Sequence, residues 1–276
     1  MDPKTGITKI FDLVAEGYDN PMLRYFSFAG EQLAKRLKLR PGEQVLDIAT
    51  GTGAFAAFAG QLIRPGGRVQ AVDLSEGMLK KAQANITRLE LDNVDFHRMD
   101  AEQLEFRSGC FDAIGCSFGI FFLTDMTAAL AQWKKLLKPG GRLMFTSFAP
   151  SAFQPMTDIL FEDLQTVGLQ LPPEGPRTAA DRLPSRDFCE SLLESAGFGD
   201  SLSQSQQLGF YFENAESWWE VLWNAGFRGY LEQLGPDQFA EFRKIHLPRI
   251  NALKNNDKIW LDVETWFSGG SRPYQS

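Results

Sequence analysis

The feature that most constrains the fold is an alternation of short apolar segments with helical segments between residues 44 and 148. Five segments have the length and composition of strands, and three of the intervals between them repeat apolar residues every three or four positions, as amphipathic helices do. Strands that alternate with helices indicate a parallel sheet covered by helices on both faces. We therefore predict an α/β fold. The expected strands are 44–49, 69–74, 94–100, 111–119 and 142–148, and the expected helices are 53–63, 75–91 and 124–138.

The rest of the chain divides around this alternation. The first 40 residues have helical spacing, and after Ala149 the rhythm changes to a helix at 153–169 and a loop with four prolines at 171–185. Further helices are expected at 186–198, 216–234 and 237–254, and strands at 201–212 and 258–273. We predict two parts: residues 1–149 hold N-terminal helices and the ligand-binding core, and residues 150–276 form a helical cap whose final strands complete the sheet.

Composition narrows the class of function. The 276 residues carry a net charge of −7, and no basic face is evident for binding a nucleic acid backbone. No apolar run is long enough for a membrane span, and no signal peptide is recognisable, so we expect a cytoplasmic protein. The three cysteines are odd in number and lack C-x-x-C spacing, which predicts reduced thiols and no metal site.

The stretch VLDIATGTGAFA joins the first strand to its helix. Glycines at this turn let an extended ligand approach the backbone, as in the G-x-G-x-x-G turn of dinucleotide enzymes, but Ala56 stands where the third glycine would be. Asp47 precedes Gly51 by four residues. A carboxylate at this position disfavours a pyrophosphate and favours an ammonium or sulfonium group, so the predicted ligand carries positive charge.

Two later strands also end in an acid. Asp73 lies 22 residues after Gly51, where an acidic side chain can accept hydrogen bonds from ribose hydroxyls. Asp100 can accept from an exocyclic amine, the Ala101 amide can meet a ring nitrogen, and Met78 can cover a purine face. In open α/β sheets ligands bind at the carboxyl ends of the strands. The predicted ligand is therefore an adenosine with a cationic amino-acid tail.

The ordered segments VLDIATGTG, AVDLSEGML, DAEQLEF and KPGGRLMF resemble the motifs of the class I S-adenosylmethionine-dependent methyltransferases, in particular the ubiquinone/menaquinone C-methyltransferase-like branch. The resemblance covers residues 11–148. It implies a Rossmann-like sheet of seven strands, mostly parallel, with one antiparallel strand in its last pair. It also implies S-adenosylmethionine as the cofactor and S-adenosylhomocysteine as its product.

The resemblance also implies the residues that contact the cofactor. Gly51 and Gly53 would line the methionine moiety, with Asp47 accepting from its amino group, while Ser117 and Phe118 would face the methyl group. Tyr18 would close the site from the N-terminal helices. The complete predicted set is Tyr18, Asp47, Ala49, Gly51, Thr52, Gly53, Asp73, Leu74, Met78, Asp100, Ala101, Ser117 and Phe118.

The segment CSFGIFF, after the fourth strand, is apolar and aromatic. It predicts O- or C-methylation of an apolar or aromatic small molecule, and it lacks the N/D-P-P-Y/F sequence that holds a planar amine. No catalytic base is identified, because His97 is expected in a structural role and His246 on a solvated helix face. Two alternatives remain: a non-catalytic cofactor-binding protein, in which the cap blocks access or serves a partner, and a nicotinamide-dependent oxidoreductase. The sequence predicts no oligomeric state.

Overall fold

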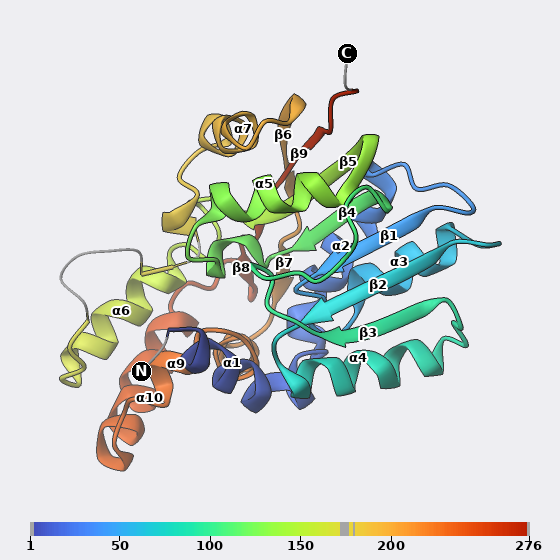
Figure 1. Ribbon diagram of the computed structural model, residues 1–276. Coiled ribbons are helices and arrows are strands. Elements are labelled where there is room, and N and C mark those ends of the chain that lie inside the picture. Colours follow the sequence, from blue (N-terminus) through green and yellow to red (C-terminus); the bar gives the residue numbers. More distant parts are fainter. Residues whose placement is uncertain (1–2, 172–176, 179, 275–276) are drawn as a thin grey trace.

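A seven-stranded sheet lies at the centre of the protein in the computed structural model, which describes residues 3–171, 177–178 and 180–274. The strands follow the order β3-β2-β1-β4-β5-β9-β6 (Figure 1). β1 to β5 are parallel to one another, and β9 is antiparallel to β5 and β6. The predicted fold class is confirmed. The bounds are β1 Gln44–Ile48, β2 Arg68–Asp73, β3 Val94–Arg98, β4 Phe111–Ser117, β5 Leu137–Phe148, β6 Gly199–Gln207 and β9 Glu264–Ser271.

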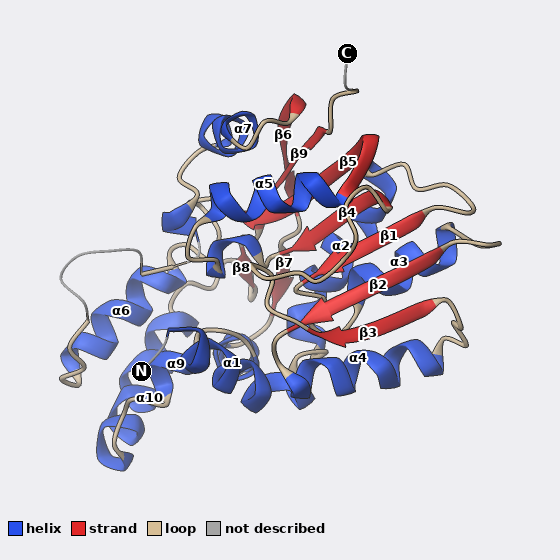
Figure 2. Ribbon diagram, viewed as in Figure 1, coloured by secondary structure: helices blue, strands red, loops and turns tan. Residues whose placement is uncertain are grey.

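Helices cover both faces of this sheet (Figure 2). α2 (Arg24–Arg36) and α3 (Ala54–Leu62) pack against each other on one face, and α5 (Met126–Leu136) and α7 (Arg186–Ser195) lie on the other. α4 (Glu76–Arg88) packs on β2 and β3 at the edge. Double coverage explains the continuous apolar runs of the central strands, since Val45, Leu46 and Ile48 of β1 are all fully buried.

The two predicted C-terminal strands are each divided, which corrects their expected bounds. β6 and β9 lie in the main sheet, whereas β7 (Phe210–Phe212) and β8 (Ile259–Leu261) pair in a separate two-stranded sheet. The side chain of Gln207 explains the break, because its Oε1 accepts from the backbone amides of Gly209 and Val263 at 2.7 and 2.9 Å. A backbone bond from the Leu208 amide to the Val263 carbonyl at 3.1 Å joins the two segments beside these contacts.

Four helices gather at the end of the molecule toward which the parallel strands point (Figure 1): α6 (Met156–Thr166), α8 (Ala215–Asn224), α9 (Arg228–Leu231) and α10 (Pro236–Asn251). α1 (Pro3–Val14) lies beside α9. The second half of the chain thus supplies a cap but also α7, β6 and β9 of the sheet layers, and the division at residues 149 and 150 stays a prediction. Among the described residues, no helix has the length and apolar character that crossing a membrane requires.

A buried polar chain holds the cap helices together. His246 of α10 is fully buried; its Nε2 accepts from Trp218 Nε1 at 3.0 Å and its Nδ1 contacts Asp163 Oδ2 at 2.7 Å. Arg249 pairs with the other oxygen of Asp163. The expectation of a solvated histidine was wrong, because the polar partners of His246 lie 28 and 83 residues away in the sequence. His97, on β3, bonds Gln70 Oε1 at 2.6 Å, which fits a structural role.

Candidate functional site

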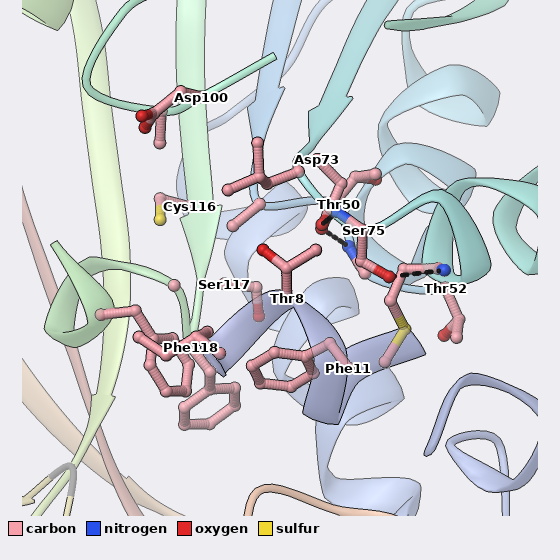
Figure 3. A pocket seen from close by; sticks show the side chains of 18 of the residues that line it. Thr8, Phe11, Thr50, Thr52, Asp73, Ser75, Asp100, Cys116, Ser117 and Phe118 are labelled. Carbon is pink, nitrogen blue, oxygen red and sulfur yellow. Dashed lines mark hydrogen bonds between the residues drawn. The ribbon is translucent and has the colours of Figure 1, made fainter. Parts of the chain in front are cut away.

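A cavity opens at the carboxyl ends of β1, β2 and β4, where the chain passes from strand to helix (Figure 3). Eleven of the thirteen predicted residues line it: Tyr18, Ala49, Gly51, Thr52, Asp73, Leu74, Met78, Asp100, Ala101, Ser117 and Phe118. Asp47 and Gly53 do not. Figure 3 shows Asp100 on one side of the cavity and the rings of Phe11 and Phe118 on the other.

The turn after β1 is held by a hydrogen bond to the end of β2. The backbone amide of Gly51 donates to Asp73 Oδ2 at 2.9 Å, and the amide of Ser75 donates to Asp73 Oδ1 at 2.9 Å. Gly51 has a φ of +55°, and a Cβ built on it would meet no atom within 4 Å. The space over this glycine is therefore open to a ligand, and the Asp73 carboxylate lies beside it.

Gly53 serves the fold. Its φ of +85° places it in the left-handed region as the residue before α3, and a Cβ there would lie 3.2 Å from the Cβ of Ala82 on α4. Gly53 does not line the cavity, and its predicted contact with the methionine moiety stays a prediction. The neighbouring Thr52 lines the cavity, and its hydroxyl donates to Asp19 Oδ1 at 2.7 Å.

Asp47 lies behind the turn and is fully buried. Its Oδ2 accepts from the Thr50 hydroxyl at 2.6 Å, while its Oδ1 has no hydrogen-bond partner among the described residues. Burial raises the pKa of this carboxyl group to about 7, although the Thr50 and Ala56 hydrogen bonds oppose the shift. Thr50, which Asp47 holds, lines the cavity, whereas Asp47 does not, and the predicted hydrogen bond of Asp47 with the ligand amino group stays a prediction.

Lys4, which the sequence analysis did not predict near the site, forms ion pairs on the side of the cavity where Asp100 lies. Lys4 Nζ lies 2.6 Å from Asp100 Oδ2 and 2.5 Å from Glu102 Oε2. Lys4 belongs to α1, which also brings Ile7, Thr8 and Phe11 to the cavity wall. The apolar spacing of Ile7 and Phe11, four residues apart on a helix, was the available signal for this wall.

The residues predicted to face the methyl group, Ser117 and Phe118, lie at the end of β4. Phe118 has a φ of +53°, its amide donates to the Thr146 hydroxyl at 3.0 Å, and its ring stacks on Phe148 with centroids 4.3 Å apart. Ser117 lies 3.4 Å from the same hydroxyl through its Oγ. The hydrogen bond and the stacked ring together hold Phe118 in a backbone conformation that bulky residues rarely adopt.

A second cavity of about 340 Å³ adjoins the first; we call it the aromatic cavity. Six residues line both: Ile7, Phe11, Tyr18, Phe26, Phe118 and Phe122. Further rings come from Tyr25, Phe121, Phe148, Phe153, Phe227 and Tyr230, and Arg177 and Arg182 also line the cavity. No Asp, Glu or His lines it within the described part of the chain. Phe227, just before α9, lines this cavity, whereas Trp219 and Leu222 of α8 are buried in the cap.

The sequence model of the ubiE/COQ5 methyltransferase family matches residues 2–167. The chain belongs to this family. A ubiquinone/menaquinone biosynthesis C-methyltransferase of Klebsiella pneumoniae is 31% identical over 207 residues, covering 70% of this chain and 82% of the relative. Together with the fold, these matches identify a methyltransferase that uses S-adenosylmethionine and acts on a small molecule.

Solved structures support the fold of this methyltransferase. The YcgJ protein of Bacillus subtilis superposes with a TM-score of 0.60 at 18% identity, covering 90% of this chain and 99% of that one. An S-adenosylmethionine-dependent methyltransferase of Aquifex aeolicus gives a TM-score of 0.51 at 22% identity, covering 72% of this chain and 89% of its own.

The first cavity suits the cofactor of this methyltransferase. The open space over Gly51 accommodates a ligand chain, and the Asp73 carboxylate beside it can accept hydrogen bonds from hydroxyl groups. The buried face of Met78 adds apolar surface. The described residues contain no group of three or more His, Cys, Asp or Glu side chains that could hold a metal ion.

Proposed function

We propose that this methyltransferase transfers the methyl group of S-adenosylmethionine to a carbon or oxygen atom of an apolar or aromatic small molecule held in the aromatic cavity. The observation that carries the proposal is the wall common to the two cavities, since Phe11, Tyr18 and Phe118 line both. A cofactor in the first cavity and an acceptor in the aromatic cavity would therefore come together at these side chains. Methyl transfer requires such contact, because the donor and acceptor atoms must be aligned in one enclosed space.

We further propose how the cofactor lies in the first cavity. Its ribose would bond Asp73, its adenine would lie between Met78 and the Asp100–Ala101 segment, and its methionine part would cross Gly51. The sulfonium would then face Ser117 and Phe118, next to the aromatic cavity. Asp47 would act on the methionine end only through Thr50, whose hydroxyl it holds.

The transfer is an in-line displacement. A new bond forms between the acceptor atom and the methyl carbon as the carbon–sulfur bond breaks, and the electron pair of that bond neutralises the sulfonium. Burial raises the pKa values of Tyr18, Tyr25 and Tyr230, so these phenols stay protonated and can only donate or accept hydrogen bonds. Because no Asp, Glu or His lines the aromatic cavity in the described residues, the acceptor proton would leave to solvent. The contribution of the protein is orientation and exclusion of water.

The names of the relatives point to a carbon acceptor in a quinol ring, and such a ring fits the aromatic wall. Arg177, Arg182, Phe227 and Tyr230, however, lie beyond residue 167, where the family match ends. The far end of the acceptor would therefore differ from that of the relatives.

The acidic charge and the cavity favour a free small molecule over a nucleic acid as the acceptor, and we infer a cytoplasmic site of action.

The test is formation of S-adenosylhomocysteine from S-adenosylmethionine with 2-naphthol and with reduced 1,4-naphthoquinone as acceptors. We expect turnover above the acceptor-free background, with the methylated atom identified by mass spectrometry and NMR. Cofactor binding without turnover on either compound would contradict the proposed acceptor class and favour the non-catalytic alternative. Turnover with the phenol alone would assign oxygen as the acceptor atom.

A further inference from the structure

We propose that the acceptor is an aromatic acid, whose ring lies beside the methyl donor and whose anionic group pairs with Arg177 and Arg182. This inference rests on the proposed function, since it names the substrate class of the same cavity. Both arginines line the aromatic cavity and neither lines the cofactor cavity. The two arginines therefore give the aromatic cavity a cationic part that the cofactor cavity lacks.

Arg182 is fixed in place by one nitrogen and keeps the others available. Its Nη1 donates to the carbonyl oxygens of Phe121 and Leu123 at 2.6 and 2.7 Å, next to the short helix Ile120–Phe122. Its Nε and Nη2 have no partner within the described residues. A guanidinium held in this way presents two donors in a fixed plane, which suits a carboxylate.

Arg177 is held by its backbone and not by its side chain. Its amide donates to Asp181 Oδ2 at 2.8 Å, and its carbonyl accepts from the Tyr230 hydroxyl at 2.7 Å. The guanidinium makes no ion pair in the part of the chain that the structure describes. Asp181 uses the same Oδ2 to accept from the Thr178 amide at 2.8 Å, so this carboxylate oxygen is directed at the backbone.

Other arginines of the cap show the contrast. Arg228 pairs with Glu232 at 2.5 Å and lies over the Trp223 ring, and Arg249 pairs with Glu162 and Asp163. Arg177 and Arg182 lack such partners among the described residues, although they border a cavity whose wall is mostly aromatic. Arg177 is exposed and Arg182 is half-buried. An anionic group between them would make charge-assisted hydrogen bonds with both side chains, which a neutral acceptor cannot make.

The test compares two ligands of nearly equal shape on protein loaded with S-adenosylhomocysteine: 3-hydroxy-2-naphthoate and its neutral amide, 3-hydroxy-2-naphthamide. Calorimetric titration should give at least tenfold tighter binding of the acid. Arg177→Gln should reduce this preference to threefold or less, because one of the two cations is lost. The matched control is Arg228→Gln, which removes an equal charge from the cap outside the cavity and should keep the preference.

The inference of an acidic acceptor is overturned by any of three results. Equal binding of acid and amide, binding of neither, or an unchanged preference in Arg177→Gln would each exclude an acid-specific cavity. Binding of S-adenosylhomocysteine should be unchanged in both variants, since neither arginine lines the cofactor cavity. Failure of the wild-type protein to bind S-adenosylhomocysteine would overturn the proposed function as well, so the two failures are distinguishable.

Discussion

The amide of Gly51 donates a 2.9 Å hydrogen bond to the carboxylate of Asp73, and so joins the turn after β1 to the end of β2. The same contact aligns an open stretch of backbone with a carboxylate at the edge of the cavity. A ligand that lies over Gly51 is therefore next to the Asp73 carboxylate.

Asp73→Ala should weaken S-adenosylmethionine binding by about 1–3 kcal/mol, because a charge-assisted acceptor is lost. Isothermal titration calorimetry measures the change. Asp92→Ala is the control, since Asp92 pairs with Arg64 at the surface and its side chain is 90% exposed. An affinity for Asp73→Ala equal to that of the control would remove Asp73 from the cofactor site.

Gly51→Val should abolish cofactor binding and leave the sheet folded. The new side chain would fill the open space over the turn, at a cost of about 1–2 kcal/mol in stability for a branched residue at positive φ. Gly109→Val is a matched control, because Gly109 also has a positive φ, +67°, and open space around its Cβ, but lies outside both cavities. Titration and thermal unfolding of both variants separate strain from blockage, and normal binding by Gly51→Val would refute the placement of the cofactor.

Asp47 makes stability depend on pH. Because burial raises its pKa from 3.8 to about 7, the folded protein holds a proton between these values that the unfolded chain releases. This contribution to stability is therefore present at low pH and declines as pH rises from about 4 to 7. Asp47→Asn should remove the decline and raise the free energy of unfolding at pH 8 by at most about 4 kcal/mol, which corresponds to a pKa difference of about 3.

Urea unfolding of wild type and Asp47→Asn across pH 4–8 checks this prediction. Asp95→Asn is the control, since pairing with Arg68 lowers the pKa of Asp95 below 3.8. Its contribution therefore changes mainly below pH 4, and this variant should keep the wild-type decline between pH 4 and 7. Parallel curves for wild type and Asp47→Asn would show that Asp47 is ionised in the folded protein at all these pH values.

The buried chain through His246 should contribute to cap stability. His246→Leu leaves the Trp218 indole nitrogen without its acceptor and removes one partner of Asp163, so we expect a loss of about 2–4 kcal/mol at pH 7. His97→Leu, which loses a hydrogen bond to Gln70 and a ring contact with Phe106 on a partly exposed strand, should cost less. Chemical unfolding of the two variants gives the comparison, and equal losses would contradict a special role for His246.

The same histidine predicts a second pH effect. Burial lowers the pKa of His246 below its ordinary 6.5, although Asp163 opposes the shift. As pH falls below 6.5 the unfolded chain takes up a proton that the folded protein resists, so stability is lost. This component should be present in wild type and absent in His246→Leu between pH 7 and 5; a wild-type dependence retained in the variant would exclude His246 as its source.

Local sequence patterns predicted the sheet well because each element carries its own signal. The apolar run before Asp47 and the glycines after it define a strand and a turn within ten residues. The family resemblance predicted seven strands with one antiparallel strand in the last pair, but not the place of β9 between β5 and β6. The break before the separate β7–β8 sheet involves a side chain, Gln207, that bonds across 56 residues.

The same difference between local signals and long-range contacts explains which parts of the site were predicted. Eleven of the predicted residues line the cavity because strand ends of a parallel sheet converge by topology. The approach of Lys4 to Asp100 and the burial of His246 depend on how distant helices dock, which no local periodicity records. The burial of Asp47 behind Thr50 was also not predicted, because the pattern gives the end of a strand but not which residue of the turn covers it.

The most direct test of the account is calorimetric titration of the purified protein with S-adenosylmethionine, S-adenosylhomocysteine and NADH, with Gly51→Val and Gly109→Val alongside. The account predicts binding of the first two ligands in the micromolar range by wild type and Gly109→Val, loss of both in Gly51→Val, and no binding of NADH. Binding of NADH alone, or equal binding of S-adenosylhomocysteine by the two glycine variants, would contradict it.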